Sequence, residues 1–133
     1  MIEAKLVWTE NERFVGQALS NHPIVVDAGK EKTANSPTEL VLIALCGCTA
    51  ADVVSILRKK REPFTTLEVS AKGERATTPP TVYTDIQLVY RVGGQVSKKA
   101  MEDAVRLSEE KYCSVSAMLA KTAKITYTIE YLK

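Results

Sequence analysis

The chain has 133 residues and a net charge of +2, with 45% hydrophobic and 26% charged residues. This length suits one domain with a single core, and the composition excludes a disordered tail protein, a collagen-like chain and a coiled coil. The small net charge creates no electrostatic demand for nucleic acid or for a membrane surface. We therefore expect a single domain over residues 1–133 that binds neither nucleic acid nor membranes.

The sequence predicts a cytoplasmic protein. Its longest nearly uncharged stretch, residues 40–51, is well short of the roughly 20 apolar residues that cross a bilayer. The N-terminal residues lack the basic stretch, apolar stretch and small-residue cleavage site of a secretory signal.

Three short strands are expected in the first part of the chain. Apolar residues at positions 2, 4, 6 and 8 alternate with polar ones, which is the period of a half-buried strand. Residues 13–20 are its expected hairpin partner. Residues 24–26 form a third predicted strand, and a polar loop follows at residues 28–35.

A long helix is predicted next. Ser36 is its N-cap, Pro37 takes the first helical position, and Glu39 completes a capping box with Ser36. Residues 40–56 are apolar on nearly every face, so we expect this helix to be buried all round. In so small a domain, that burial indicates a second subunit.

The second half of the chain begins after Pro63, which ends the long helix. It contains predicted strands at residues 67–71 and 86–92, an amphipathic helix capped by Ser97 with Ser108 on its apolar face, a short helix at about residues 114–120 and a strand at residues 125–131. The resulting order, β-β-β-α-β-β-α-α-β, favours an α+β fold over a doubly wound parallel sheet.

The cysteines are Cys46, Cys48 and Cys113. An odd number in a reducing compartment argues against a disulfide framework. On a helix, Cys46 and Cys48 point about 200° apart, so they cannot pair with each other, and a zinc site that adds Cys113 and His22 is disfavoured. We expect no metal, and we expect Cys46 to be a core residue.

Cys113 lies between two helical stretches, directly before residues 114–116. Free amide groups and the positive end of a helix dipole can lower the pKa of a thiol there, so a reactive thiolate is chemically reasonable. A cysteine that caps the helix and has no redox role is the open alternative.

Three segments together resemble a known family. They are Ser-Pro-Thr-Glu-Leu at residues 36–40, Ala-Leu-Cys-Gly-Cys-Thr-Ala at 44–50 and Lys-Tyr-Cys-Ser-Val-Ser at 111–116. The chain resembles the OsmC/Ohr family of osmotically inducible and organic hydroperoxide resistance proteins over essentially its whole length. Residues 47–54 look most like the OsmC-like branch. The resemblance implies an intertwined α+β homodimer with a long buried central helix and sites at the subunit interface.

The resemblance also implies a thiol peroxidase that reduces organic hydroperoxides in oxidative-stress defence. Cys48 matches the attacking cysteine of the family, which becomes a sulfenic acid. Cys113 matches the resolving cysteine, which forms a disulfide that a dithiol reductant reopens. Such an enzyme needs no metal, haem or flavin.

Family peroxidases also place an Arg in the first hairpin and a Glu at the start of the long helix. Arg13 and Glu39 are the candidates, each one position away from the family pattern, and Thr38 stands where the Glu is expected. From the residues alone, Arg13 could be a solvent-facing charge and Glu39 only part of the capping box. Asp52 shares a helical face with Cys48, where it would orient a cation or raise the thiol pKa.

Two other functions fit the sequence. One is a non-enzymatic OsmC-like dimer that binds a small apolar ligand or a protein partner and holds poorly activated cysteines. The other is a purely structural interaction domain whose three thiols are buried.

Overall fold

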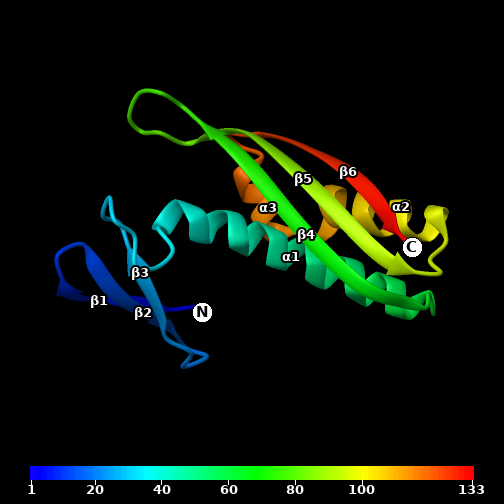
Figure 1. The fold of residues 1–133 in the computed structure, drawn as a ribbon, viewed down its shortest axis with the longest axis horizontal. Helices are drawn as coiled ribbons and strands as arrows, with labels where there is room; N and C mark the ends of the chain where they lie inside the picture. Colours follow the sequence, from blue (N-terminus) through cyan, green and yellow to red (C-terminus); the bar gives the residue numbers. More distant parts are fainter. The chain divides into compact units, whose positions relative to one another are not determined.

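The computed structural model describes residues 1–133 as six strands, three α-helices and one π-helical turn (Figure 1). In chain order they are β1 Ala4–Glu10, β2 Arg13–Ala18, β3 Ile24–Asp27, α1 Pro37–Lys59, β4 Phe64–Arg75, β5 Tyr83–Gly94, α2 Lys98–Leu107, the π-helical turn η1 Ser108–Tyr112, α3 Ser114–Leu119 and β6 Lys124–Leu132. This order confirms the predicted α+β fold and adds η1. The chain divides into two compact units, Met1–Val41 and Leu42–Lys133, which are described in turn.

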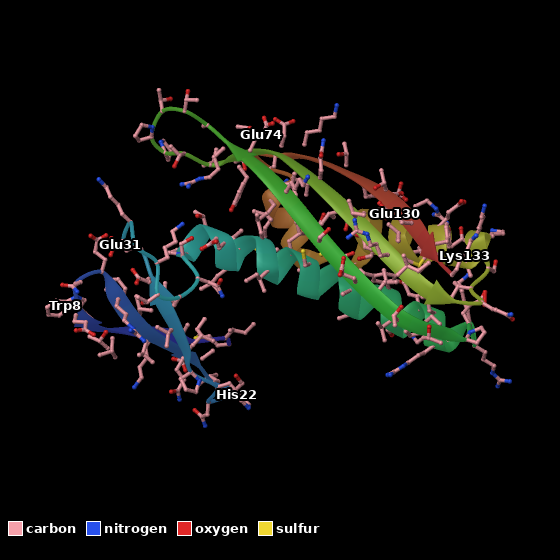
Figure 2. All side chains as sticks on the ribbon, in the orientation of Figure 1. Trp8, His22, Glu31, Glu74, Glu130 and Lys133 are labelled. Carbon is pink, nitrogen blue, oxygen red and sulfur yellow. The ribbon has the colours of Figure 1, made fainter.

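The first unit contains an antiparallel sheet in the order β1-β2-β3. Strand β1 is exposed along its whole length, with Leu6 54%, Val7 55% and Trp8 64% exposed. The side chain of Trp8 points away from the ribbon in Figure 2. The prediction of a half-buried β1 is therefore wrong for the single chain, because its unit has no second sheet or complete helix to cover it.

The loop before α1 is held by the carboxylate of Asp27, the last residue of β3. Asp27 accepts hydrogen bonds from the Gly29 amide at 2.8 Å, the Thr33 amide at 2.9 Å and the Thr33 hydroxyl at 2.7 Å. These bonds, those from Thr33 first, lower the pKa of Asp27 to about 2. The polar loop predicted at residues 28–35 is thus ordered around one acidic side chain.

Helix α1 begins and ends as its sequence signals predict. The Ser36 amide donates to the Glu39 carboxylate at 2.8 Å, and the Glu39 amide donates to the Ser36 hydroxyl at 3.3 Å, which confirms the capping box. At the other end, Arg61 has a φ of 57°, and the Glu62 amide donates at 3.0 Å to the carbonyl of Leu57. This Schellman closure satisfies the last carbonyls just before the predicted proline stop.

Within the chain, α1 buries one face. Its fully buried residues recur every four positions and are Leu45, Thr49, Val53 and Leu57. Its other faces are half-buried or exposed, and Ile43 is 53% exposed. A single chain therefore does not bury α1 on all sides. The predicted second subunit would have to cover the faces that remain half-buried or exposed.

By length and composition alone, α1 would also suit a membrane span, with a mean hydropathy of 2.3 over an 18-residue window. The apolar character of α1 resumes after Asp52, beyond residues 40–51 on which the expectation of no membrane span rests. The core helix of a globular protein has the same composition, and α1 packs its Leu45–Leu57 stripe inside its own chain.

The second unit is built on a sheet in the order β4-β5-β6. The central strand β5 is antiparallel to β4 and parallel to β6, so the chain must cross over between β5 and β6. Helices α1, α2 and α3 lie against one face of this sheet (Figure 1). On the other face, Arg91 pairs with Glu68 at 2.7 Å and with Glu130 at 2.9 Å. The inward-facing residues of β5 are Ile86, Leu88, Tyr90 and Val92, all at most 1% exposed.

The crossover begins with α2, which Ser97 caps by accepting a 3.2 Å hydrogen bond from the Ala100 amide. Its buried stripe, Ala100, Met101, Ala104 and Val105, confirms the predicted amphipathic helix. The chain then continues into η1, where the Cys113 amide donates at 2.8 Å to the carbonyl of Ser108, five residues back. This wider turn changes which side chains face the sheet just before Cys113.

Candidate active site

Two of the cysteines meet in the second unit. Cys48 is half-buried on α1, and Cys113 is buried between η1 and α3. Their side chains are hydrogen-bonding partners, and neither is in a disulfide. The fold therefore brings together two thiols that are about 65 positions apart in the sequence.

Cys113 caps α3 through its sulfur, which accepts a hydrogen bond from the Ser116 amide at 3.3 Å. Burial nevertheless raises the pKa of Cys113 to about 12, with further upward contributions from Cys48 and Glu109. The Ser116 amide at the helix end does lower this pKa, as expected, but burial outweighs it because the thiol is only 3% exposed.

A carboxylate stands beside this cap. The Ser116 hydroxyl donates to Glu109 at 2.8 Å, and the Tyr90 hydroxyl donates to the same carboxylate at 3.2 Å. Glu109 lies in η1, Ser116 in α3 and Tyr90 in β5. Three elements are thus joined at one side chain next to Cys113.

The hydrogen bonds continue from Tyr90 back to α1. The Thr49 hydroxyl lies 2.7 Å from that of Tyr90 and 2.8 Å from that of Ser108. Ser108 in turn donates to the Asp52 carboxylate at 2.9 Å. The Tyr90 and Ser108 hydroxyls each donate their proton to a carboxylate. The Thr49 hydroxyl therefore has one proton to donate and two neighbouring hydroxyl oxygens that can accept it.

This series, from Asp52 through Ser108, Thr49, Tyr90 and Glu109 to Ser116, is called the hydroxyl network below. Three of its members, Thr49, Tyr90 and Ser108, are fully buried. No buried side-chain nitrogen or oxygen in the structure lacks a partner. A fully satisfied buried network of this kind rigidifies its surroundings, here the junction between Cys48 and Cys113.

The predicted site residues Arg13 and Glu39 belong to the first unit. Arg13 lies opposite Asp27 in the β2–β3 register, and its charge helps to lower the Asp27 pKa. Glu39 is bonded to Ser36, and its carboxylate is 3.8 Å from the Lys32 ammonium. Each has a structural role among its neighbours, and a catalytic role for either stays a prediction.

The remaining sequence candidates lie on α1. Cys46 is half-buried rather than part of the fully buried core, and burial raises its pKa. Asp52 accepts a hydrogen bond from Ser108, and a role in orienting a cation stays a prediction. No three His, Cys, Asp or Glu side chains converge as a set of metal ligands.

Sequence reasoning missed most of the hydroxyl network. Thr49, Tyr90, Glu109 and Ser116 gave no separate signal, because their partners are distant in the sequence. Ser108 did give a signal in the sequence, because a polar residue on the apolar face of a helix needs a buried hydrogen-bonding partner.

Comparisons with known proteins agree on one family. The family model described as OsmC-like protein matches residues 29–128. The chain is 42% identical to protein YhfA of Escherichia coli K12 over 130 residues, 97% of each chain. A hypothetical protein from Aquifex aeolicus is 31% identical with a TM-score of 0.87, covering 100% of this chain and 98% of its own. An organic hydroperoxide resistance protein from Elizabethkingia anophelis shares the fold at 14% identity and a TM-score of 0.74, covering 99% and 96%.

Proposed function

Because the chain belongs to the OsmC-like protein family, we propose that it is a cysteine-based peroxidase that reduces organic hydroperoxides. The observation that carries this proposal is the contact between the Cys48 and Cys113 side chains. The fold shared with a protein named for organic hydroperoxide resistance supports the substrate class. The physiological setting we propose is defence against oxidative stress.

The reaction has two steps on the protein. The Cys48 thiolate attacks one peroxide oxygen, the O–O bond breaks, and the alkoxide leaves and takes a proton to become the alcohol. Cys48 is then a sulfenic acid. The Cys113 sulfur attacks the Cys48 sulfur, the S–O bond breaks, and the hydroxyl leaves with the Cys113 proton as water. An external dithiol returns the Cys48–Cys113 disulfide to two thiols and is itself oxidised to a disulfide.

Accessibility and protonation support the two proposed roles. Cys48 is half-buried, whereas Cys113 is 3% exposed, so a peroxide from solvent meets Cys48 more readily. The raised pKa of Cys113, about 12, keeps that residue a neutral thiol at physiological pH. A thiolate is the nucleophile in peroxide chemistry, so Cys48 attacks and Cys113 resolves.

We further propose that the protein acts as a homodimer in a reducing compartment such as the cytoplasm. Large apolar side chains are exposed on β1, where Trp8 is 64% exposed, and on α1, where Ile43 is 53% exposed, and a second subunit that covers them would account for both. Free cysteines also suit a reducing compartment. Analytical ultracentrifugation tests the assembly, and a monomer at micromolar concentration would contradict it.

Steady-state turnover with cumene hydroperoxide and a dithiol tests the activity. Cys48→Ser is expected to abolish turnover, whereas Cys46→Ser, two positions away on the same helix, is expected to retain it. Cys113→Ser should lose sustained turnover with the dithiol. Equal turnover by the Cys48→Ser variant and the unmodified protein would disprove the proposal.

One observation favours a second candidate function, a non-enzymatic dimer that binds a small apolar ligand or a protein partner. Both residues expected to activate the thiol interact within the first unit: Glu39 accepts a hydrogen bond from Ser36, and the charge of Arg13 acts on Asp27. Poorly activated cysteines would follow if no other group replaces them. Thiols that stay reduced in the presence of organic hydroperoxide would support this alternative.

A further inference from the structure

Two neighbouring glutamates on η1 face different surroundings. Glu109 is half-buried, and its carboxylate accepts hydrogen bonds from Ser116 and Tyr90. Glu110 is exposed and lies 3.8 Å from the Arg106 guanidinium. The π-helical turn directs the first carboxylate toward the thiols and leaves the second at the surface.

The position of Glu109 matters because Cys113 depends on the same neighbour. The Ser116 hydroxyl donates to Glu109 at 2.8 Å, while the Ser116 amide donates to the Cys113 sulfur at 3.3 Å. One residue therefore connects the carboxylate to the hydrogen bond that caps α3. A displacement of the Glu109 side chain would leave the Ser116 hydroxyl without this acceptor.

The titratable groups that face Cys113 come from three elements. They are the Cys48 thiol on α1, the Tyr90 hydroxyl on β5 and the Glu109 carboxylate on η1. The Ser116 amide of α3 is the hydrogen-bond donor to the sulfur. A negative charge on Cys113 would be repelled by the carboxylate of Glu109.

We propose that Glu109 is the positioning residue of the thiol pair: its hydrogen bonds to Ser116 and Tyr90 hold the turn that presents Cys113 to Cys48, and its negative charge faces the Cys113 sulfur. Glu109 thereby adds to the burial that opposes a negative charge on the Cys113 sulfur. The consequence for turnover, that Cys48 attacks and Cys113 resolves, rests on the peroxidase function proposed above.

Competitive alkylation tests the proposal without peroxide. Reduced protein is treated with limiting iodoacetamide, and mass mapping gives the ratio of modification at Cys48 to that at Cys113. Removal of one nearby charge changes ionisation by an amount on the order of one pKa unit. Glu109→Gln is therefore expected to lower the ratio by roughly threefold to tenfold, because Cys113 ionises more readily without the carboxylate.

Two further variants separate charge from shape. Glu110→Gln removes the neighbouring charge on the same turn and is expected to leave the ratio unchanged. Glu109→Asp keeps the charge and is expected to retain most of the unmodified ratio. An unchanged ratio in Glu109→Gln, or the same ratio in Glu109→Asp and Glu109→Gln, would overturn the proposal.

Circular dichroism establishes that each variant is folded. If Glu109→Gln does not fold, Ser116→Ala takes its place, since it removes a hydroxyl that holds the carboxylate and keeps the amide cap. The ratio of Cys48 to Cys113 modification in Ser116→Ala should also decrease, by a smaller factor. An unchanged ratio in this variant would overturn the proposal. Lack of peroxide turnover in the unmodified protein would contradict the proposed function while leaving this alkylation result interpretable.

Discussion

The hydroxyl of Thr49 lies 2.7 Å from the hydroxyl of Tyr90, in a part of the chain where both residues are fully buried. Thr49 follows Cys48 directly on α1, and Tyr90 is on the central strand of the sheet. This contact ties the helix that carries the half-buried Cys48 thiol to the sheet that supports the second unit.

Thr49→Val tests the energetic value of the hydroxyl network. Valine keeps the shape but leaves the hydroxyls of Tyr90 and Ser108 short of a partner in a buried site. We expect the free energy of unfolding to fall by about 1–3 kcal/mol. Urea denaturation measures it, with Thr126→Val on the exposed face of β6 as the control, expected within about 0.5 kcal/mol of the unmodified protein. A loss at Thr49 no larger than at Thr126 would contradict the network's role.

The raised pKa of Cys113 predicts a loss of stability at alkaline pH. An unfolded cysteine ionises near pH 8.5, whereas folded Cys113 ionises near pH 12. The folded state therefore holds its proton where the unfolded state has lost it. The contribution of Cys113 to stability is complete below about pH 8.5 and is lost progressively as the pH rises toward about 12.

Urea denaturation of the unmodified protein and of Cys113→Ser at several pH values measures this effect. As the pH rises from 8 to 11, the unfolding free energy of the unmodified protein should decrease relative to that of the Cys113→Ser variant. A difference that does not vary with pH would mean that folded Cys113 ionises at its ordinary pKa.

Asp27 predicts a complementary effect at acid pH in the first unit. Its folded pKa of about 2 lies below the value near 3.9 of an unfolded aspartate. Its stabilising contribution is therefore present above about pH 4 and lost as the pH falls toward 2. Asp27→Asn should remove this dependence and speed hydrogen exchange at the amides of Gly29 and Thr33. Unchanged exchange at both amides would show that Asp27 does not hold the loop.

Local signals account for the parts of the fold that were predicted correctly. Ser36, Glu39 and Ser97 mark helix starts through bonds to residues three positions away, so the sequence alone reveals them. Strand β1 is present as predicted, but its half-burial was wrong because its apolar residues are exposed in the single chain. The pattern shows which residues are apolar and does not show what covers them.

The candidate site also has parts that local sequence signals reveal and parts that only the tertiary structure reveals. The cysteines were found through their flanking residues, and the structure brings their side chains together. Glu109 was missed because its inward orientation depends on the π-helical turn, which hydrophobic periodicity does not reveal. The helix end that can lower the pKa of Cys113 is visible in the sequence, whereas the burial that outweighs it is a tertiary property.

The most direct test of the central claim is a single-turnover reaction of the reduced protein with one equivalent of cumene hydroperoxide. Peptide mass mapping then locates any new disulfide, and a parallel sample receives hydrogen peroxide. The peroxidase account predicts a Cys48–Cys113 disulfide that forms faster with the organic peroxide, with Cys46 still reduced. If Cys48 and Cys113 both remain reduced thiols, the peroxidase account is contradicted.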